Sequence, residues 1–153
     1  MHLRLLPGRL LTVRCLLKFD LHKIRTKNPI KKATLSLYAV STAGIGKGHS
    51  TLSGSNEFVL VKVTSSWKEH KVTWNTQPCF TEEGTIQLPA TSSEMQDFLD
   101  IDVTKMVQDM INNPKENYGV MIKLVTEEYY RRVIFGSSDN NDPTKRPKLA
   151  IQF

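Results

Sequence analysis

The sequence has little cysteine, no long apolar run and no Cys-x-x-Cys or Cys/His cluster that would indicate zinc. Its two cysteines are Cys15 and Cys79. Cys15 follows the apolar phase of its predicted strand, so we expect a buried free thiol, and a disulfide with Cys79 is the alternative. No uninterrupted apolar stretch approaches the length needed to span a membrane, so we expect no membrane span.

The first residues resemble a secretory signal only superficially. Pro7 and Gly8 break the apolar run, and no small-residue cleavage site follows. We therefore expect no signal peptide in this chain. A length of 153 residues fits one domain. We assign residues 12–153 to a single domain and residues 1–11 to an N-terminal segment, with a truncated first strand as one interpretation.

The chain also lacks the groupings of side chains that catalysis needs. The pairs Glu82–Glu83 and Glu127–Glu128 are adjacent, and neighbours in an extended chain point in opposite directions, which suits an acid/base pair poorly. The glycine-rich run 44–48 lacks a phosphate-binding signature, so we expect a loop. We therefore expect that this chain is not an enzyme. No triad or metal set surrounds the histidines, which we expect to be solvated: His2, His22, His49 and His70.

Positive charge is concentrated at the start of the chain. Residues 1–32 hold nine Lys and Arg against one acid, a net charge of +8, and the rest of the chain has a net charge of −2. Such an excess indicates either a solvated basic edge or a surface for an anionic polymer: nucleic acid, acidic polysaccharide or a membrane surface. Aromatic residues are nearly absent from this segment, which argues against nucleic acid.

Alternation of apolar and polar residues predicts strands. Residues 14–21 and 33–39 alternate clearly, with Cys15 to Leu21 on odd positions facing inward. Residues 41–56 are rich in Gly, Ser and Thr and predict a long, flexible loop. Further strands are expected at Val59 to Trp67, Val72 to Trp74, Ile86 to Leu88, 118–125, 131–135 and 148–153, the last with Leu149, Ile151 and Phe153 inward.

One segment has a different period. In residues 102–111, apolar side chains recur at helical spacing, Asp102 or Thr104 can cap the start, and Asn113-Pro114 would end it. Many short strands with turns between them indicate a sandwich or jelly roll. The predicted fold is therefore all-β, an antiparallel β-sandwich of jelly-roll type with one short α-helix.

Seven ordered segments of the chain form a recognisable pattern. They are 16–21, 32–38, 67–69, 72–78, 101–104, 117–120 together with 135–138, and 146–149. Together they resemble the DNRLRE domain, the disaggregatase-related group that includes the family-96 carbohydrate-binding modules. The resemblance covers roughly residues 12–153. It implies a β-sandwich module of secreted or surface-anchored multidomain microbial proteins, often beside polysaccharide-degrading domains, with acidic polysaccharide such as alginate as the ligand where one is known.

Outward basic residues are the main candidate ligand contacts. Dispersed Lys and Arg suit the carboxylates of a uronate polymer, although outward strand positions are usually polar in any case. Trp67 and Trp74 share the phase of strand valines, so we expect both to pack in the core. Tyr38 and one of Tyr129 and Tyr130 are expected to be exposed. The candidate ligand-binding residues are Arg14, Lys18, Tyr38, Lys62, Lys71, Lys123, Tyr130 and Arg132.

The oxygen-rich turn 138–142 has two interpretations. Asp139 and Asp142 are candidate ligands for a calcium ion, while Asx turns explain the same residues without an ion. No cofactor is required by anything in the sequence. The first hypothesis for function is a non-catalytic module that binds an acidic polysaccharide. The alternative is a structural or adhesive spacer module of a surface protein, with a nucleic-acid binder third.

Overall fold

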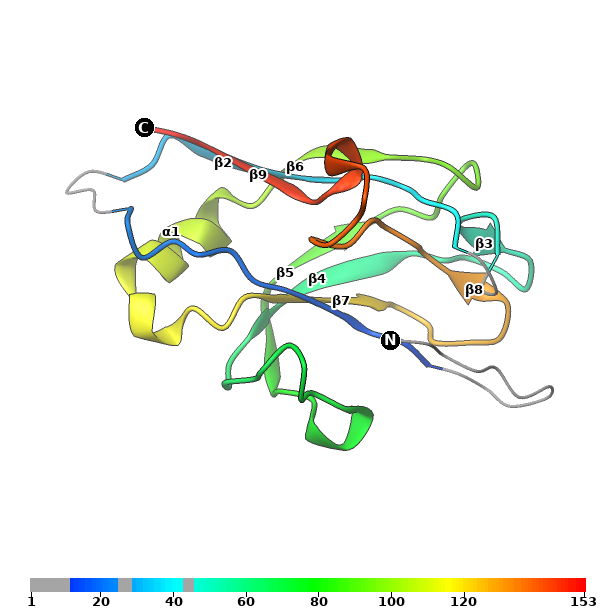
Figure 1. The fold of residues 1–153 in the computed structure, drawn as a ribbon, viewed down its shortest axis with the longest axis horizontal. Helices are drawn as coiled ribbons and strands as arrows, with labels where there is room; N and C mark the ends of the chain where they lie inside the picture. Colours follow the sequence, from blue (N-terminus) through cyan, green and yellow to red (C-terminus); the bar gives the residue numbers. More distant parts are fainter. Residues whose placement is uncertain (1–11, 25–28, 43–45) are drawn as a thin grey trace.

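The computed structural model describes residues 12–24, 29–42 and 46–153 (Figure 1). The expectations for residues 1–11, for His2 and for part of the glycine-rich run 44–48 lie outside these ranges. Within the described residues, no helix is both long and apolar enough to cross a membrane.

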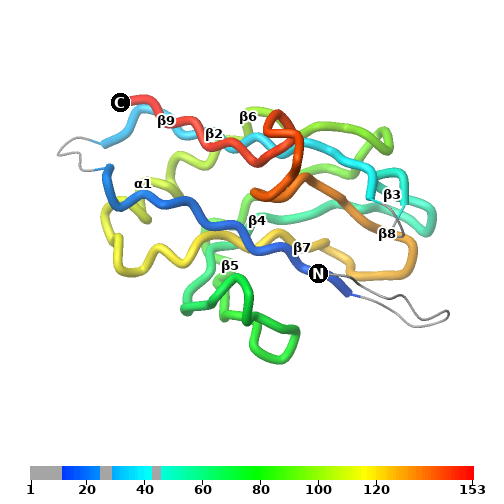
Figure 2. Tube along the Cα trace, viewed as in Figure 1, coloured from blue at the N-terminus to red at the C-terminus, as the bar shows by residue number. Residues whose placement is uncertain are grey.

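Two antiparallel sheets pack face to face, so the predicted all-β sandwich with one short helix is confirmed (Figures 1 and 2). A four-stranded sheet has the order β1-β7-β4-β5, a three-stranded sheet has the order β6-β2-β9, and β3 pairs with β8. The strands are β1 (Cys15–Leu17), β2 (Lys32–Leu37), β3 (Ser50–Thr51), β4 (Phe58–Val63), β5 (Phe80–Leu88), β6 (Phe98–Asp102), β7 (Val120–Leu124), β8 (Arg131–Arg132) and β9 (Lys148–Gln152).

The main core lies between the two sheets. From the three-stranded sheet, β2 contributes Ala33, Leu35 and Leu37, all nearly or fully buried, as the alternation of residues 33–39 predicts. From the four-stranded sheet, Phe58 and Leu60 of β4 face them. Apolar burial of this kind supplies most of the favourable free energy of folding.

A second apolar cluster covers the outer face of the four-stranded sheet. Val59, Val61 and Val63 of β4 are buried there, opposite to Phe58 and Leu60, so both faces of this strand are apolar. Leu16, Trp67, Phe80 and Tyr118 pack against the valines. Residues of β4 that alternate with the valines lie on the face that meets the main core.

The helix α1 (Thr104–Asn112) closes one end of the sandwich, as the helical spacing predicts. Met106, Val107 and Met110 are buried on its inner side. The Asp102 carboxylate accepts hydrogen bonds from the backbone N–H and the hydroxyl of Thr104, at 2.9 and 2.6 Å. The helix ends before Pro114, which opens the 3₁₀ turn η2 (Pro114–Glu116).

Strand β5 contains a large irregularity. It pairs with β4 in one register at Ile86 and in another at Thr81, and the shift places extra residues of β5 in a bulge. Gly84 lies in this bulge with a φ of 73°, which is strained for residues with a side chain. The bulge turns toward α1, and the sequence predicts only a turn region and a short strand here.

Several strand predictions are wrong in their details. Residues 72–74 form no strand, because the segment crosses the outer face as turns and the 3₁₀ turn η1 (Trp74–Thr76). Cys15 lies on the inner phase of β1, paired with Ile122, but the residue is exposed because β1 borders the described sheet. Phe153 follows the end of β9 and is 60% exposed instead of facing inward. Cys15 and Cys79 are both free and exposed.

The predicted loop 41–56 contains a buried histidine. His49 is 1% exposed, which contradicts the expected solvated side chain. Its Nε2 lies 2.9 Å from the carbonyl oxygen of Gln96, and its Nδ1 accepts a hydrogen bond from the backbone N–H of Ile134 at 2.9 Å. Burial lowers the pKa of His49 below 6.5. The ring is therefore a neutral structural element that joins this loop to the segment after β8 and to the segment before β6.

Candidate functional site

The outer face of the four-stranded sheet carries an exposed tryptophan stacked on an arginine. Trp74 is 51% exposed, and the Arg14 guanidinium carbon lies 4.9 Å from its ring centroid. The prediction that Trp74 packs in the core is wrong, because η1 turns the indole outward over the start of β1. Trp67 is partly buried in the outer apolar cluster and donates its indole N–H to the Tyr118 carbonyl at 2.8 Å, as its predicted packing requires.

Arg14 is fixed by three hydrogen bonds. Its Nε and Nη2 donate to the two carboxylate oxygens of Glu127, both at 2.8 Å, and its Nη1 donates to Gln77 Oε1 at 2.9 Å. Bidentate pairs of this kind hold the guanidinium in one plane. The hydrogen bond from Arg14 lowers the pKa of Glu127, and the bond to Glu127 raises the pKa of Arg14. Both groups are ionised at neutral pH, so the charge of Arg14 is largely balanced.

Lys123 lies on the same outer face. It pairs with Val59 across β7 and β4, and its Nζ lies 5.6 Å from the ring centroid of Phe80. Its positive charge also helps to lower the pKa of Glu127. We call Arg14, Trp74, Gln77, Lys123 and Glu127 the Trp74 platform.

A tyrosine pair lies next to the platform in sequence and in space. Tyr129 and Tyr130 follow Glu127 in the connection between β7 and β8, and their ring centroids are 6.5 Å apart. Both are exposed, at 53% and 67%, whereas the sequence predicts one exposed ring. Tyr130 has a φ of 59°, which turns the chain sharply into β8.

Two more predicted basic residues surround this face. Lys71 is exposed in the segment that leads to Trp74. Lys18 is exposed just beyond β1, where it lines a hollow of about 480 Å³ with Trp67, Glu69 and Asn117. Buried Asn117 donates to the Phe19 carbonyl at 3.0 Å, and its Oδ1 has no protein partner among the described residues. Lys18, Lys123 and Arg14 therefore belong to one side of the molecule.

The remaining candidates lie elsewhere. Lys62 pairs with Val120, on the inner phase of β4, and lines a cleft beside α1. Arg132 donates its Nε to the Gly48 carbonyl at 2.9 Å and fixes a loop. Tyr38 belongs to the segment after β2, in the other sheet, with Lys145 Nζ 5.8 Å from its ring centroid. The predicted ligand-binding residues are thus divided over several surfaces.

The turn 138–142 is organised by its own hydrogen bonds. Asp142 Oδ1 accepts from the Thr144 hydroxyl at 2.7 Å and from the Thr144 N–H at 2.9 Å, and it caps the 3₁₀ turn η3 (Pro143–Lys145). These two hydrogen bonds lower the pKa of Asp142. Asn140 Oδ1 accepts from the Asp142 N–H at 2.9 Å. No group of three or more potential metal ligands from His, Cys, Asp and Glu occurs in the described part of the chain. Calcium at Asp139 and Asp142 stays a prediction.

Sequence reasoning missed Gln77 and Glu127 and misplaced Trp74. A local signal for the turn does exist, because the backbone N–H of Thr73 donates to the Thr76 hydroxyl at 2.8 Å, a threonine spacing typical of a capped turn. The partnership of Arg14 with Glu127 joins residues 113 positions apart, which no local pattern reveals.

Comparisons with known proteins agree with this architecture. No curated protein matches the chain with significant similarity. The family model described as carbohydrate-binding module family 96 matches residues 10–153, which is nearly the whole chain. A β-sandwich with an exposed, rigidly held aromatic platform suits such a module, and this chain belongs to carbohydrate-binding module family 96.

Proposed function

We propose that this chain is a non-catalytic module that binds an acidic, uronate-type polysaccharide across the Trp74 platform. Its partner as a member of the family is a carbohydrate. In this proposal the module belongs to a larger, secreted or cell-surface protein, and it holds that protein on its polysaccharide.

The observation that carries the proposal is the position of Trp74. Arg14 supports one side of the indole, and about half of the side chain remains exposed. Sugar rings present C–H groups on their faces, so they pack on flat aromatic side chains. The bonds from Arg14 to Glu127 and Gln77 hold the support in place before a ligand arrives. Such preorganisation reduces the entropy lost on binding.

The charge of the platform supports an anionic ligand. Arg14 and Glu127 balance each other, so the remaining positive charge comes from Lys123 and from exposed Lys18 on the same side. Exposed Lys71 lies in the segment that leads to Trp74. Uronate carboxylates spaced along a polymer would meet these ammonium groups one at a time. Attraction between exposed charges of this kind is weakened by salt.

Affinity electrophoresis in gels containing alginate, pectate or a neutral glucan tests the proposal. We expect retardation by a uronate polymer that decreases with added salt. Trp74→Ala should weaken binding about tenfold through lost stacking, and Lys123→Ala should weaken it about threefold and reduce its dependence on salt.

Two matched variants serve as controls. Phe153→Ala removes an exposed aromatic ring outside the platform, and Lys148→Ala removes an exposed charge from the other sheet. Both should bind like the unchanged chain. Retardation by neutral glucans alone would contradict the acidic preference. Absence of any polysaccharide binding by the folded chain would favour a structural or adhesive spacer.

A further inference from the structure

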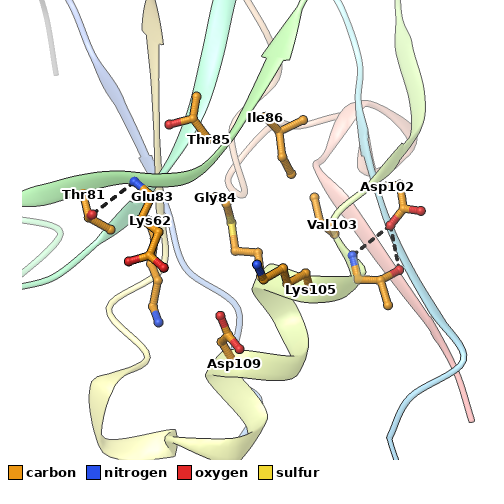
Figure 3. Close-up of a pocket in the computed structure, with 12 residues that line it drawn as sticks. Lys62, Thr81, Glu83, Gly84, Thr85, Ile86, Asp102, Val103, Lys105 and Asp109 are labelled. Atoms are coloured by element: carbon orange, nitrogen blue, oxygen red, sulfur yellow. Dashed lines mark hydrogen bonds between the residues drawn. The ribbon is translucent and has the colours of Figure 1, made fainter.

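A cleft of about 320 Å³ opens between α1 and the bulge of β5 (Figure 3), and no residue of the Trp74 platform lines it. The β5 bulge forms one wall and the first turns of α1 form the other. A Cβ built on Gly84 would have no atom within 4 Å, so the bulge faces open space. A volume of this size falls in the range of small-molecule sites, which starts at about 300 Å³.

Five charged side chains line the cleft, and four of them differ from the fifth, Asp102. Lys62 and Glu83 come from the sheet, while Lys105 and Asp109 lie one turn apart on α1 (Figure 3). Among the described residues no ion pair joins any of them, and no side-chain hydrogen bond uses their charged groups. By contrast, Asp102, which also lines the cleft, is occupied by its bonds to Thr104. Two ammonium groups and two carboxylates therefore keep their full capacity for hydrogen bonds.

The floor of the cleft is apolar. Ile86, Val103 and Met106 line it, and Val103 and Met106 are buried parts of the main core. A surface with an apolar floor and a charged rim matches a sugar unit, whose C–H face is apolar and whose hydroxyls donate and accept at the edge. The two lysines are outnumbered by the carboxylates of Glu83, Asp102 and Asp109, so the rim offers no net attraction to a polyanion.

We infer that this cleft is a second carbohydrate site, which takes a neutral saccharide unit and is independent of the Trp74 platform. The carboxylates of Glu83 and Asp109 accept hydrogen bonds from sugar hydroxyls, and Lys62 and Lys105 donate. The inference requires the family's carbohydrate binding but not the uronate preference proposed above.

Backbone amide NMR of the whole chain, titrated with neutral tetrasaccharides, locates binding directly. Cellotetraose, mannotetraose and laminaritetraose serve as probes, with tetragalacturonate as the charged comparison. We expect at least one neutral probe to shift the amides of Gly84, Thr85 and Lys105. The double substitution Glu83→Gln and Asp109→Asn should weaken that binding about tenfold, because each charged acceptor becomes a neutral amide.

Matched variants separate this site from the platform. Glu82→Gln changes an exposed carboxylate of the same bulge that does not line the cleft, and it should bind normally. Trp74→Ala should leave the shifts at Gly84 unchanged although it weakens uronate binding. The inference is overturned if no neutral probe shifts these amides, if the shifts occur only around Trp74, or if tetragalacturonate shifts the cleft amides most strongly.

Discussion

The two ends of the sandwich differ in whether their polar side chains are buried and hydrogen-bonded or exposed and without a protein partner. At the β3–β8 end, His49 and Asn56 are buried, and their side chains are bonded to backbone groups of distant segments. At the α1 end, charged side chains surround an open cleft and have no partner among the described residues. A buried polar group without a partner is costly, whereas an exposed one is solvated. The first end therefore contributes stability, and the second keeps groups available for a ligand.

The largest effect should come from the closed end, through Asn56. Its side chain is fully buried, donates to Thr91 Oγ1 and the Arg132 carbonyl at 2.8 and 3.0 Å, and accepts from the Thr91 N–H at 2.8 Å. Asn56→Ala leaves these buried partners without a hydrogen bond and should lower the free energy of unfolding by about 4 kcal/mol. Urea denaturation measures it. Exposed Asn141→Ala is the control, and an equal loss in both variants would contradict the comparison.

Glycine substitutions compare the two ends directly. Gly48, with a φ of 146°, leaves no room for a Cβ beside the Glu94 carbonyl oxygen, so Gly48→Ala should cost about 3 kcal/mol. Gly84 has a φ of 73° but open space around it, so Gly84→Ala should cost only about 1 kcal/mol, from backbone strain alone. Thermal and urea unfolding measure both, and a reversed order would refute the contrast.

The smallest effect is a pH dependence from His49. Burial lowers its pKa in the folded chain below 6.5, although Asp97 acts in the opposite direction. The unfolded chain therefore binds a proton more readily, and the stability that His49 contributes is fully present above about pH 6.5 and decreases as the pH falls below it. Protonation also removes the acceptor of the Ile134 N–H, so the loss should be on the order of 1 kcal/mol.

Urea unfolding from pH 7.5 down to about pH 5 measures this dependence. The difference in free energy of unfolding between the unchanged chain and His49→Gln should shrink as the pH falls. The reason is that protonation of His49 destabilises the unchanged chain, whereas the variant has no histidine at this position. His70→Gln, at an exposed position, should show a constant difference from the unchanged chain. A constant difference for His49→Gln as well would exclude the histidine as the source.

Sequence patterns predict the features that depend on neighbouring residues. The alternation around Leu35 predicts β2, and the spacing of Met106 and Met110 predicts α1, because one face of each element is buried. The same patterns wrongly predict that Lys62 points outward. Both faces of β4 are apolar, so the alternation of residues does not indicate which face meets the other sheet.

The wrong predictions for Trp74 and His49 have a different cause. Trp74 stands in phase with Val72, but the turn η1 replaces the strand that would have buried it. His49 lies in a segment with loop composition, and its partners are backbone groups 47 and 85 residues away. The Trp74 platform depends on the similarly distant contact between Arg14 and Glu127. Long-range contacts of this kind decide the candidate site, and single-sequence patterns do not contain them.

The bulge of β5 also bears on self-association. Among the described strands, β1 and β5 border the four-stranded sheet, and an exposed regular border offers free N–H and C=O groups to a strand of another molecule. The register shift near Gly84 interrupts that row on β5, while β1 is only three residues long and is flanked by Arg14 and Lys18. We therefore expect the irregularity that opens the cleft also to disfavour aggregation through the β5 edge of the sheet.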